Sequence, residues 1–113
     1  RTLFFVRKSI PIKALGILSL RKPKTQHLTI RISGDVQGVG FRFMARQKAR
    51  ELKIVGFAKN MEDGSVLVEA EGSTEKLETF LKWCKEGPSF ASIEKTESSM
   101  MPELQKYKDF KID

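Results

Sequence analysis

Residues 27–42 read HLTIRISGDVQGVGFR, which joins a strand pattern to the start of a helix through a glycine-rich turn. Apolar and polar residues alternate over His27–Ser33, and this period of two predicts a half-buried strand. Gly34–Gly40 follows with three glycines in seven residues, and Arg42–Ile54 then carries apolar residues at helical spacing. The run therefore predicts a strand, a tight loop and a helix in direct succession.

The rest of the sequence continues in short elements of the same kind. Asp63-Gly64 predicts a hairpin between two apolar runs, and Gly87-Pro88 predicts the end of a second helix. The further predicted elements are strands over Val55–Met61 and Ser65–Glu71, a helix over Ser73–Glu86, and extended segments over Phe90–Ser99 and Tyr107–Ile112. The order β-α-β-β-α-β, with an extra short C-terminal strand, indicates an α+β ferredoxin-like split βαβ sandwich. In that fold the sheet is antiparallel and both helices lie on one face.

The net charge of +7 comes from one end of the chain. Residues 1–25 hold seven basic residues and no acid, whereas the other 88 residues hold 14 basic and 14 acidic side chains. The sequence therefore predicts a basic, apolar leader over residues 1–25, which is disordered, a remnant of expression or a targeting segment. A single neutral domain is predicted over residues 26–113. The longest uncharged run of the leader, Ala14–Leu20, is too short for a transmembrane segment.

Histidine and cysteine occur once each, as His27 and Cys84. A single cysteine cannot form an internal disulfide, which favours a reducing compartment, and we expect a cytoplasmic location. One histidine and one cysteine are too few for a zinc cluster, and His27 has no flanking support for a catalytic triad. We therefore expect no metal and no cofactor, and we expect Cys84 to belong to the core because it lies on an apolar helical stripe.

The loop Gly34–Gly40 has the composition of an anion-binding turn. Its glycines let several main-chain N–H groups point inward, and the following helix adds unpaired N–H groups and a partial positive charge. Arg42 stands in the first helical turn, where its guanidinium can bind two oxygens of a tetrahedral anion. An ordinary tight turn is the alternative, and the spacing fits neither a P-loop nor a convincing dinucleotide-binding loop. We use the name nest for the main-chain groups of Gln37, Gly38, Val39, Gly40 and Phe41.

Residues 56–72 carry a second motif, GFAKNMEDGSVLVEAEG. Together with GDVQGVGFR at Gly34–Arg42, it resembles the acylphosphatase family. The two signatures of that family are G-x-V-Q-G-V-x-F-R and G-aromatic-small-K-N-x3-G-x-V-x5-G, and both are present in full. Tyr107–Ile112 also looks like the closing strand of the family. The resemblance covers His27–Asp113 and leaves residues 1–25 unmatched.

The resemblance implies an enzyme that hydrolyses the carboxyl–phosphate bond of small acyl phosphates to a carboxylate and inorganic phosphate. It implies that Arg42 and the nest bind the phosphoryl group and that Asn60 positions the attacking water. With no histidine base available, the substrate phosphate is the implied proton acceptor. We expect a small acyl phosphate as substrate, inorganic phosphate as product and inhibitor, and a monomeric protein.

Alternatives remain for both residues and for the function. Arg42 could be a surface arginine of the helix, and Asn60 could be a turn former at a strand end. The chain could also be an acylphosphatase-like module that binds an anion or a partner without turnover. A nucleic-acid binder acting through residues 1–25 is the third possibility, but the predicted strands lack the aromatic pattern that stacks bases, so no nucleic acid is expected.

Overall fold

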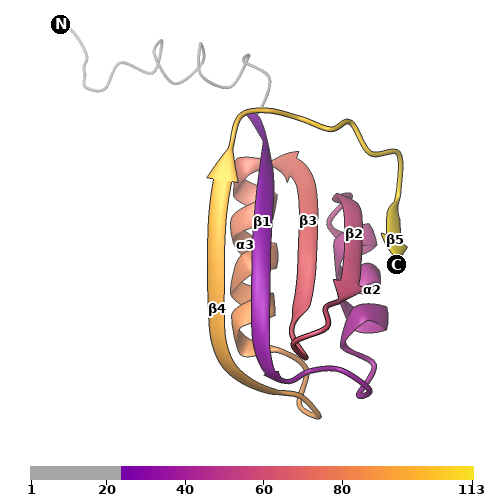
Figure 1. The fold of residues 1–113 in the computed structure, drawn as a ribbon. Coiled ribbons are helices and arrows are strands. Elements are labelled where there is room, and N and C mark those ends of the chain that lie inside the picture. Colours follow the sequence, from indigo (N-terminus) through magenta and orange to yellow (C-terminus); the bar gives the residue numbers. More distant parts are fainter. Residues whose placement is uncertain (1–23) are drawn as a thin grey trace, which may run out of the picture.

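The computed structural model describes residues 24–113. They form a five-stranded sheet with two helices packed on one face, and no helix of the described residues covers the other face (Figure 1). The predicted basic leader lies almost wholly outside the described residues, and both the leader and its boundary stay predictions. The first strand begins at Thr25, two residues before the strand that the alternating pattern predicts.

The order of elements in the described chain confirms the predicted ferredoxin-like α+β fold. The elements are β1 (Thr25–Asp35), α2 (Phe41–Glu51), β2 (Val55–Asn60), β3 (Val66–Ser73), α3 (Thr74–Glu86), β4 (Ser92–Met101) and β5 (Phe110–Ile112). The strand order in the sheet is β4-β1-β3-β2-β5. β1 pairs with β3 and with β4, and β2 pairs with β3, all in antiparallel register.

The sheet differs from the predicted antiparallel arrangement at one edge, because β5 runs parallel to β2. After β4 the chain crosses one end of the sheet to the opposite edge and enters β5 in the direction of β2 (Figure 1). Ala58 of β2 pairs with Ile112 of β5 in this register. The crossing brings Ile112 and Asp113 beside the last residues of β2.

The hydrophobic core lies between the sheet and the two helices. Alternate residues of β1 turn inward, and Leu28, Ile30 and Ile32 are at most 1% exposed. Each helix adds one buried stripe, which consists of Phe41, Ala45 and Ala49 in α2 and of Leu77, Phe80 and Cys84 in α3. Burial raises the pKa of the Cys84 thiol, so this side chain is a neutral packing group.

The two helices begin in different ways. At the start of α3 the Ser73 hydroxyl accepts a hydrogen bond of 3.4 Å from the N–H of Lys76, and Glu75 adds a negative charge in the first turn. At the start of α2 stands Gly40, with no side-chain cap and no acidic residue in the first turn. The N-terminus of α2 therefore keeps its positive end and its donors available for an anion.

The helix-free face of the sheet carries a polar network around His27. Its Nδ1 lies 2.6 Å from a carboxylate oxygen of Glu71, and its Nε2 contacts Glu69, both on β3. Glu71 also accepts the main-chain N–H groups of Gln105 and Lys106 in the connection between β4 and β5. The network therefore ties this connection to the sheet, at the end of β1 opposite to the nest.

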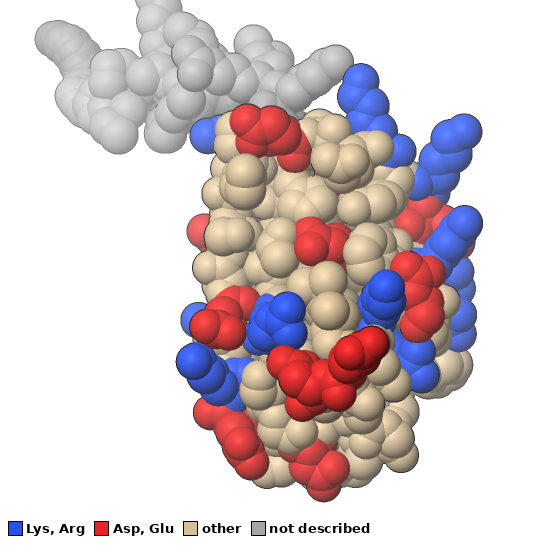
Figure 2. Space-filling view, viewed as in Figure 1, with Lys and Arg blue, Asp and Glu red and all other residues tan. Residues whose placement is uncertain are grey.

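The surface of the described chain mixes acidic and basic side chains. Figure 2 shows them interspersed on the helix-free face. β4, at one edge of the sheet, carries Glu94, Lys95 and Glu97, with Lys95 Nζ 3.6 Å from Glu97 Oε2. No helix within residues 24–113 is long and apolar enough to cross a membrane.

Candidate active site

The nest lies at the N-terminus of α2. Gly38 and Gly40 have φ angles of +78° and +83°, a conformation that side chains with a Cβ rarely adopt. The N–H of Met44 bonds to the oxygen of Gly40 at 3.1 Å, so the N–H groups before Met44 precede the helical hydrogen-bond ladder. The loop thus presents main-chain donors at the positive end of a helix, an arrangement that suits a tetrahedral anion.

The side chain of Gln37 joins the nest to the second motif. Its Nε2 donates to the main-chain oxygens of Met61 at 2.7 Å and Ser65 at 2.8 Å. Both oxygens belong to the hairpin between β2 and β3, and Met61 directly follows Asn60. Gln37 therefore fixes the nest relative to Asn60, a side-chain function that the sequence did not predict.

Arg42 is the second residue of α2, and its side chain is half-buried. Its Nη1 donates a hydrogen bond of 2.6 Å to the main-chain oxygen of Asp113, which directly follows β5. A guanidinium carries five N–H donors, so the contact leaves others for an anion. The contact sets the direction of the Arg42 side chain.

Asn60 ends β2, and its Oδ1 is buried without a hydrogen-bond partner among the described residues. A buried acceptor without a partner costs roughly 1–3 kcal/mol of folding free energy. Nearly all buried acceptors in proteins are paired, so this oxygen points to a donor supplied by water or a ligand. A role as turn former would account for the position of Asn60 but not for its free oxygen.

A cavity of about 140 Å³ brings the two motifs together. Its lining consists of Val36, Gly38, Gly40, Phe41, Arg42, Phe43, Asn60 and Ile112. Arg42 is the one ionisable side chain in this lining, so the cavity is positively charged and contains neither a carboxylate nor an imidazole. Its chemistry must therefore depend on a guanidinium, main-chain donors and an amide oxygen.

The cavity collects most of the predicted site residues, namely Gly38, Gly40, Phe41, Arg42 and Asn60. Gln37 and Val39 are not in the lining; the Gln37 side chain bonds to the hairpin, and the Val39 side chain packs against the hydrophobic core. Val36, Phe43 and Ile112 line the cavity and were not predicted as site residues. For Phe43 the available signal was its place directly after Arg42, and for Ile112 it was the similarity of β5 to the closing strand of a family.

The titratable groups with shifted pKa values lie outside the cavity. Hydrogen bonds from Ser65 lower the pKa of Asp63, and Arg31 stands 3.2 Å from the same carboxylate. His27 is held in its network at the far end of β1. Among residues 24–113 no group of three or more His, Cys, Asp or Glu side chains is arranged to hold a metal ion.

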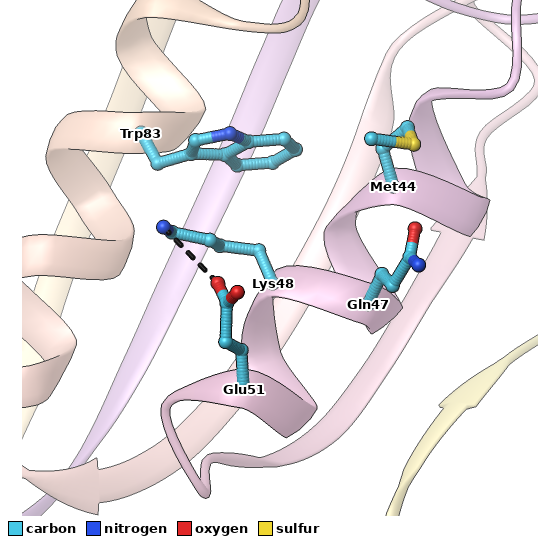
Figure 3. Close-up of a pocket in the computed structure, with 5 residues that line it drawn as sticks. All are labelled: Met44, Gln47, Lys48, Glu51 and Trp83. Carbon is cyan, nitrogen blue, oxygen red and sulfur yellow. Dashed lines mark ion pairs between the residues drawn. The ribbon is translucent and has the colours of Figure 1, made fainter.

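A second hollow, of about 270 Å³, lies between α2 and α3 (Figure 3). Trp83 of α3 faces Met44 and Lys48 of α2 across it, and Lys48 Nζ pairs with Glu51 at 3.3 Å. This hollow has no contribution from Arg42, Asn60 or the nest, and its charged groups already pair with each other. The smaller cavity is therefore the better candidate for the active site.

Comparison with known proteins identifies the family of the chain. The family model described as Acylphosphatase matches residues 28–112. An acylphosphatase of Caldanaerobacter subterraneus subsp. tengcongensis is 44% identical over 89 residues, which cover 79% of this chain and 97% of that protein. The crystal structure of acylphosphatase from Bacillus subtilis has a TM-score of 0.76 at 32% identity, over 78% of this chain and 98% of that one. Full-length HypF in its phosphate- and nucleotide-bound form has a TM-score of 0.75 at 35% identity, over 83% of this chain and 12% of its own length. These similarities make the chain a member of the acylphosphatase family, and so an enzyme that hydrolyses acyl phosphates.

Proposed function

We propose that Arg42 and the nest bind the phosphoryl group of a small acyl phosphate and that Asn60 positions the water that attacks it. The carboxyl–phosphate bond is cleaved, and the products are a carboxylate and inorganic phosphate. The observation that carries the proposal is the unpaired Oδ1 of Asn60, which lies in the lining of the same cavity as Arg42.

Phosphoryl binding is supported by the charge of the cavity. In phosphoryl transfer the negative charge is spread over three oxygens of the transferring group. Donors held in fixed positions stabilise this charge without having to reorganise during the reaction. The uncapped N-terminus of α2, the nest and the Arg42 guanidinium are donors of this kind, and no carboxylate of the lining opposes them.

Water positioning is supported by the chemistry of the Asn60 side chain. An amide oxygen accepts a hydrogen bond and stays unprotonated at neutral pH, so it orients a water without competing for its proton. Because Oδ1 has no partner among the described residues, it is free for that bond. The hydrogen bonds of Gln37 to the hairpin hold Asn60 and the nest in a fixed relation.

The reaction needs no further catalytic side chain. The water oxygen forms a bond to phosphorus while the bond between phosphorus and the acyl oxygen breaks. The electron pair of the broken bond goes to the carboxylate, a good leaving group that needs no strong general acid. A phosphate oxygen of the substrate takes the proton of the water. Positioning and charge neutralisation are the main demands of phosphoryl transfer, and the lining of the cavity supplies both.

Hydrolysis of acetyl phosphate in the presence of EDTA tests this proposal, with the wild type, Asn60→Ala and Lys59→Ala compared. Lys59 precedes Asn60 on β2 and is exposed, so its variant is a matched control. We expect Asn60→Ala to lower kcat about 10²–10³-fold, the usual effect of removing one group that acts in the transition state. Competitive inhibition by phosphate should stay unchanged, and Lys59→Ala should behave like the wild type.

Three outcomes would contradict parts of the proposal. Near wild-type turnover by a folded Asn60→Ala would assign the water to another group. Loss of wild-type activity in EDTA, with recovery on adding zinc or magnesium, would refute the metal-independent reaction. Phosphate binding without any turnover would favour the non-catalytic, anion-binding module.

We also propose that the enzyme acts as a monomer in the cytoplasm and without nucleic acid. The free, buried thiol of Cys84 supports a reducing compartment. The cavity contains both Arg42 and Asn60, so the proposed chemistry requires no residue from a second subunit. The interspersed charges of the helix-free face offer no continuous basic surface to a phosphate backbone (Figure 2). Gel filtration and a nucleic-acid mobility assay test the last two points.

A further inference from the structure

Two exposed phenylalanines stand beside the nest. Three large apolar side chains are conspicuously exposed among residues 24–113, namely Phe43 at 52%, Phe90 at 51% and Met101 at 48%. Phe43 lines the cavity, and the Cε1 atom of Phe90 lies 3.9 Å from the point that a Cβ on Gly40 would occupy. Single exposed apolar residues are ordinary, but two beside one anion-binding loop require an explanation.

Neither ring is needed for the hydrophobic core. Phe41 lies in the same helical turn as Phe43 but points inward. It is 1% exposed and packs against Trp83 at 5.6 Å between ring centroids. Phe43 turns outward, with the guanidinium of Arg46 5.4 Å from its ring centroid. Phe90 belongs to the connection between α3 and β4, outside both elements. Packing therefore accounts for Phe41 but not for Phe43 or Phe90.

The size of the cavity indicates which part of a substrate can contact Phe43 and Phe90. A volume of about 140 Å³ has room for roughly four or five water molecules. A phosphoryl group and one attacking water use that space, so the acyl group of a substrate must extend to the rim. Only one oxygen separates the acyl carbon from phosphorus, which keeps the acyl group next to the nest.

We propose that Phe43 and Phe90 form an acyl subsite that selects substrates with an aromatic acyl group over those with a short aliphatic one. The inference rests on the proposed function, because it requires the phosphoryl group to lie in the nest. Two aromatic rings in contact gain favourable interaction energy in addition to that from the burial of their surface. An exposed phenyl ring also loses contact with water when a substrate covers it. A methyl group is too small to cover either ring.

Benzoyl phosphate and acetyl phosphate are the matched substrates for the test. The proteins are the wild type, Phe43→Ala, Phe90→Ala and Met101→Ala, with folding checked by circular dichroism. Met101 ends β4, at the end of the sheet away from the nest, so its variant controls for the loss of an exposed apolar side chain (Figure 1). We expect each phenylalanine variant to lose about 5- to 10-fold in kcat/KM for benzoyl phosphate and less than 2-fold for acetyl phosphate. Met101→Ala should leave both values unchanged.

Binding of benzoylphosphonate and acetylphosphonate, measured by calorimetry, separates this inference from the proposed function. These analogues lack the bond that is hydrolysed, so their affinities do not depend on turnover. A preference for benzoylphosphonate that disappears in the phenylalanine variants supports the subsite, even if the wild type hydrolyses neither substrate and the proposed function fails. Equal affinity of the two analogues for the wild type, or equal losses with both substrates in the variants, would overturn the subsite while leaving the hydrolysis proposal intact.

Discussion

Gln37 donates a hydrogen bond of 2.8 Å from its side-chain amide to the main-chain oxygen of Ser65. The same nitrogen reaches the oxygen of Met61 at 2.7 Å, so one side chain connects the nest to the hairpin that follows Asn60. The two motifs are separated along the chain by α2, and this bond joins them directly. Their relative position therefore depends on an amide donor and not on packing alone.

Replacing Gln37 with glutamate should loosen this connection. The carboxylate has the same shape but no donor, and it would face two main-chain oxygens. We expect a loss of about 1–3 kcal/mol in the free energy of unfolding and weaker inhibition by phosphate. Gln47→Glu, at an exposed position on α2, is the control. Urea unfolding measures the first effect, and equal stability of the two variants would contradict the structural role of Gln37.

Arg42 should affect both phosphate binding and turnover. In the proposed mechanism the Arg42 charge acts on the phosphoryl group before and during the reaction, so in Arg42→Ala phosphate should inhibit less strongly and kcat should fall about 10²–10³-fold. Arg42→Lys should restore little, because a point charge cannot reproduce a planar fork of donors. Arg50→Ala is the control, since Arg50 lies on the same helix and pairs with Asp109 outside the cavity. Normal phosphate inhibition of a folded Arg42→Ala would refute the site.

The network around His27 should make stability depend on pH. Burial lowers the pKa of His27, but hydrogen bonds to Glu71 and Glu69 outweigh it, so the pKa lies above its ordinary value of 6.5. For Glu71 burial raises the pKa, but bonds from His27 and two main-chain N–H groups outweigh it, so the pKa lies below 4.5. The raised pKa of His27 stabilises the fold fully below pH 6.5, and this contribution is lost as the pH rises through the folded pKa. The lowered pKa of Glu71 stabilises the fold fully above pH 4.5, and this contribution is lost as the pH falls through the folded pKa. The network is therefore most stabilising between pH 4.5 and pH 6.5.

Urea unfolding at pH 6 and pH 8.5 measures the histidine part of this dependence. The free energy of unfolding of the wild type should be lower at pH 8.5 than at pH 6. His27→Gln should show a smaller difference between the two pH values because glutamine does not titrate. The groups that face His27 are Glu69 and Glu71 from β3 and Tyr107 from the connection before β5. Burial raises the pKa of Tyr107, so this phenol stays neutral over the range. Parallel pH profiles for the wild type and His27→Gln would exclude the network as the cause.

Removal of residues 1–23 should leave both stability and hydrolysis close to those of the full chain. The main-chain oxygen of Lys24 accepts the N–H of Thr74 at 2.9 Å, so the truncated chain should retain Lys24. Residues 1–25 share no motif with the site and hold all of the excess charge. Thermal unfolding and acetyl phosphate turnover of the shortened protein test the boundary. If the shortened protein does not fold, residues 1–23 belong to the domain and the predicted boundary is wrong.

Local patterns in the sequence predicted most of the fold. The alternation over β1 and the helical stripes of α2 and α3 report burial directly, because a residue turned inward must be apolar. The parallel direction of β5 is different, since it depends on where the connection after β4 crosses the sheet. No periodicity within Tyr107–Ile112 encodes that crossing, and the observed strand is only Phe110–Ile112.

The residues of the candidate site were also predictable only in part. Gly38, Gly40, Arg42 and Asn60 belong to compact motifs whose residue types suit an anion and a water, so the sequence pointed to them. The bond from Arg42 to Asp113 joins positions 71 residues apart, and the Glu71 carboxylate meets N–H groups more than 30 residues away. Such partners follow from the folded topology, which a single sequence without its fold does not contain. Phe90 is apolar and lies in a connection without periodicity, so nothing in the sequence separated it from a core residue until its exposure was known.

The charged edge of β4 has a consequence for the behaviour of the protein at high concentration. An edge strand presents unpaired main-chain groups to which a strand of another molecule can add, and this addition starts β-sheet aggregation. Glu94, Lys95 and Glu97 lie on β4, and a second copy added there in parallel register would place side chains of the same charge opposite each other. Charged residues on an edge strand are typical gatekeepers against aggregation, so we expect the replacement of all three by valine or threonine to increase fibril formation.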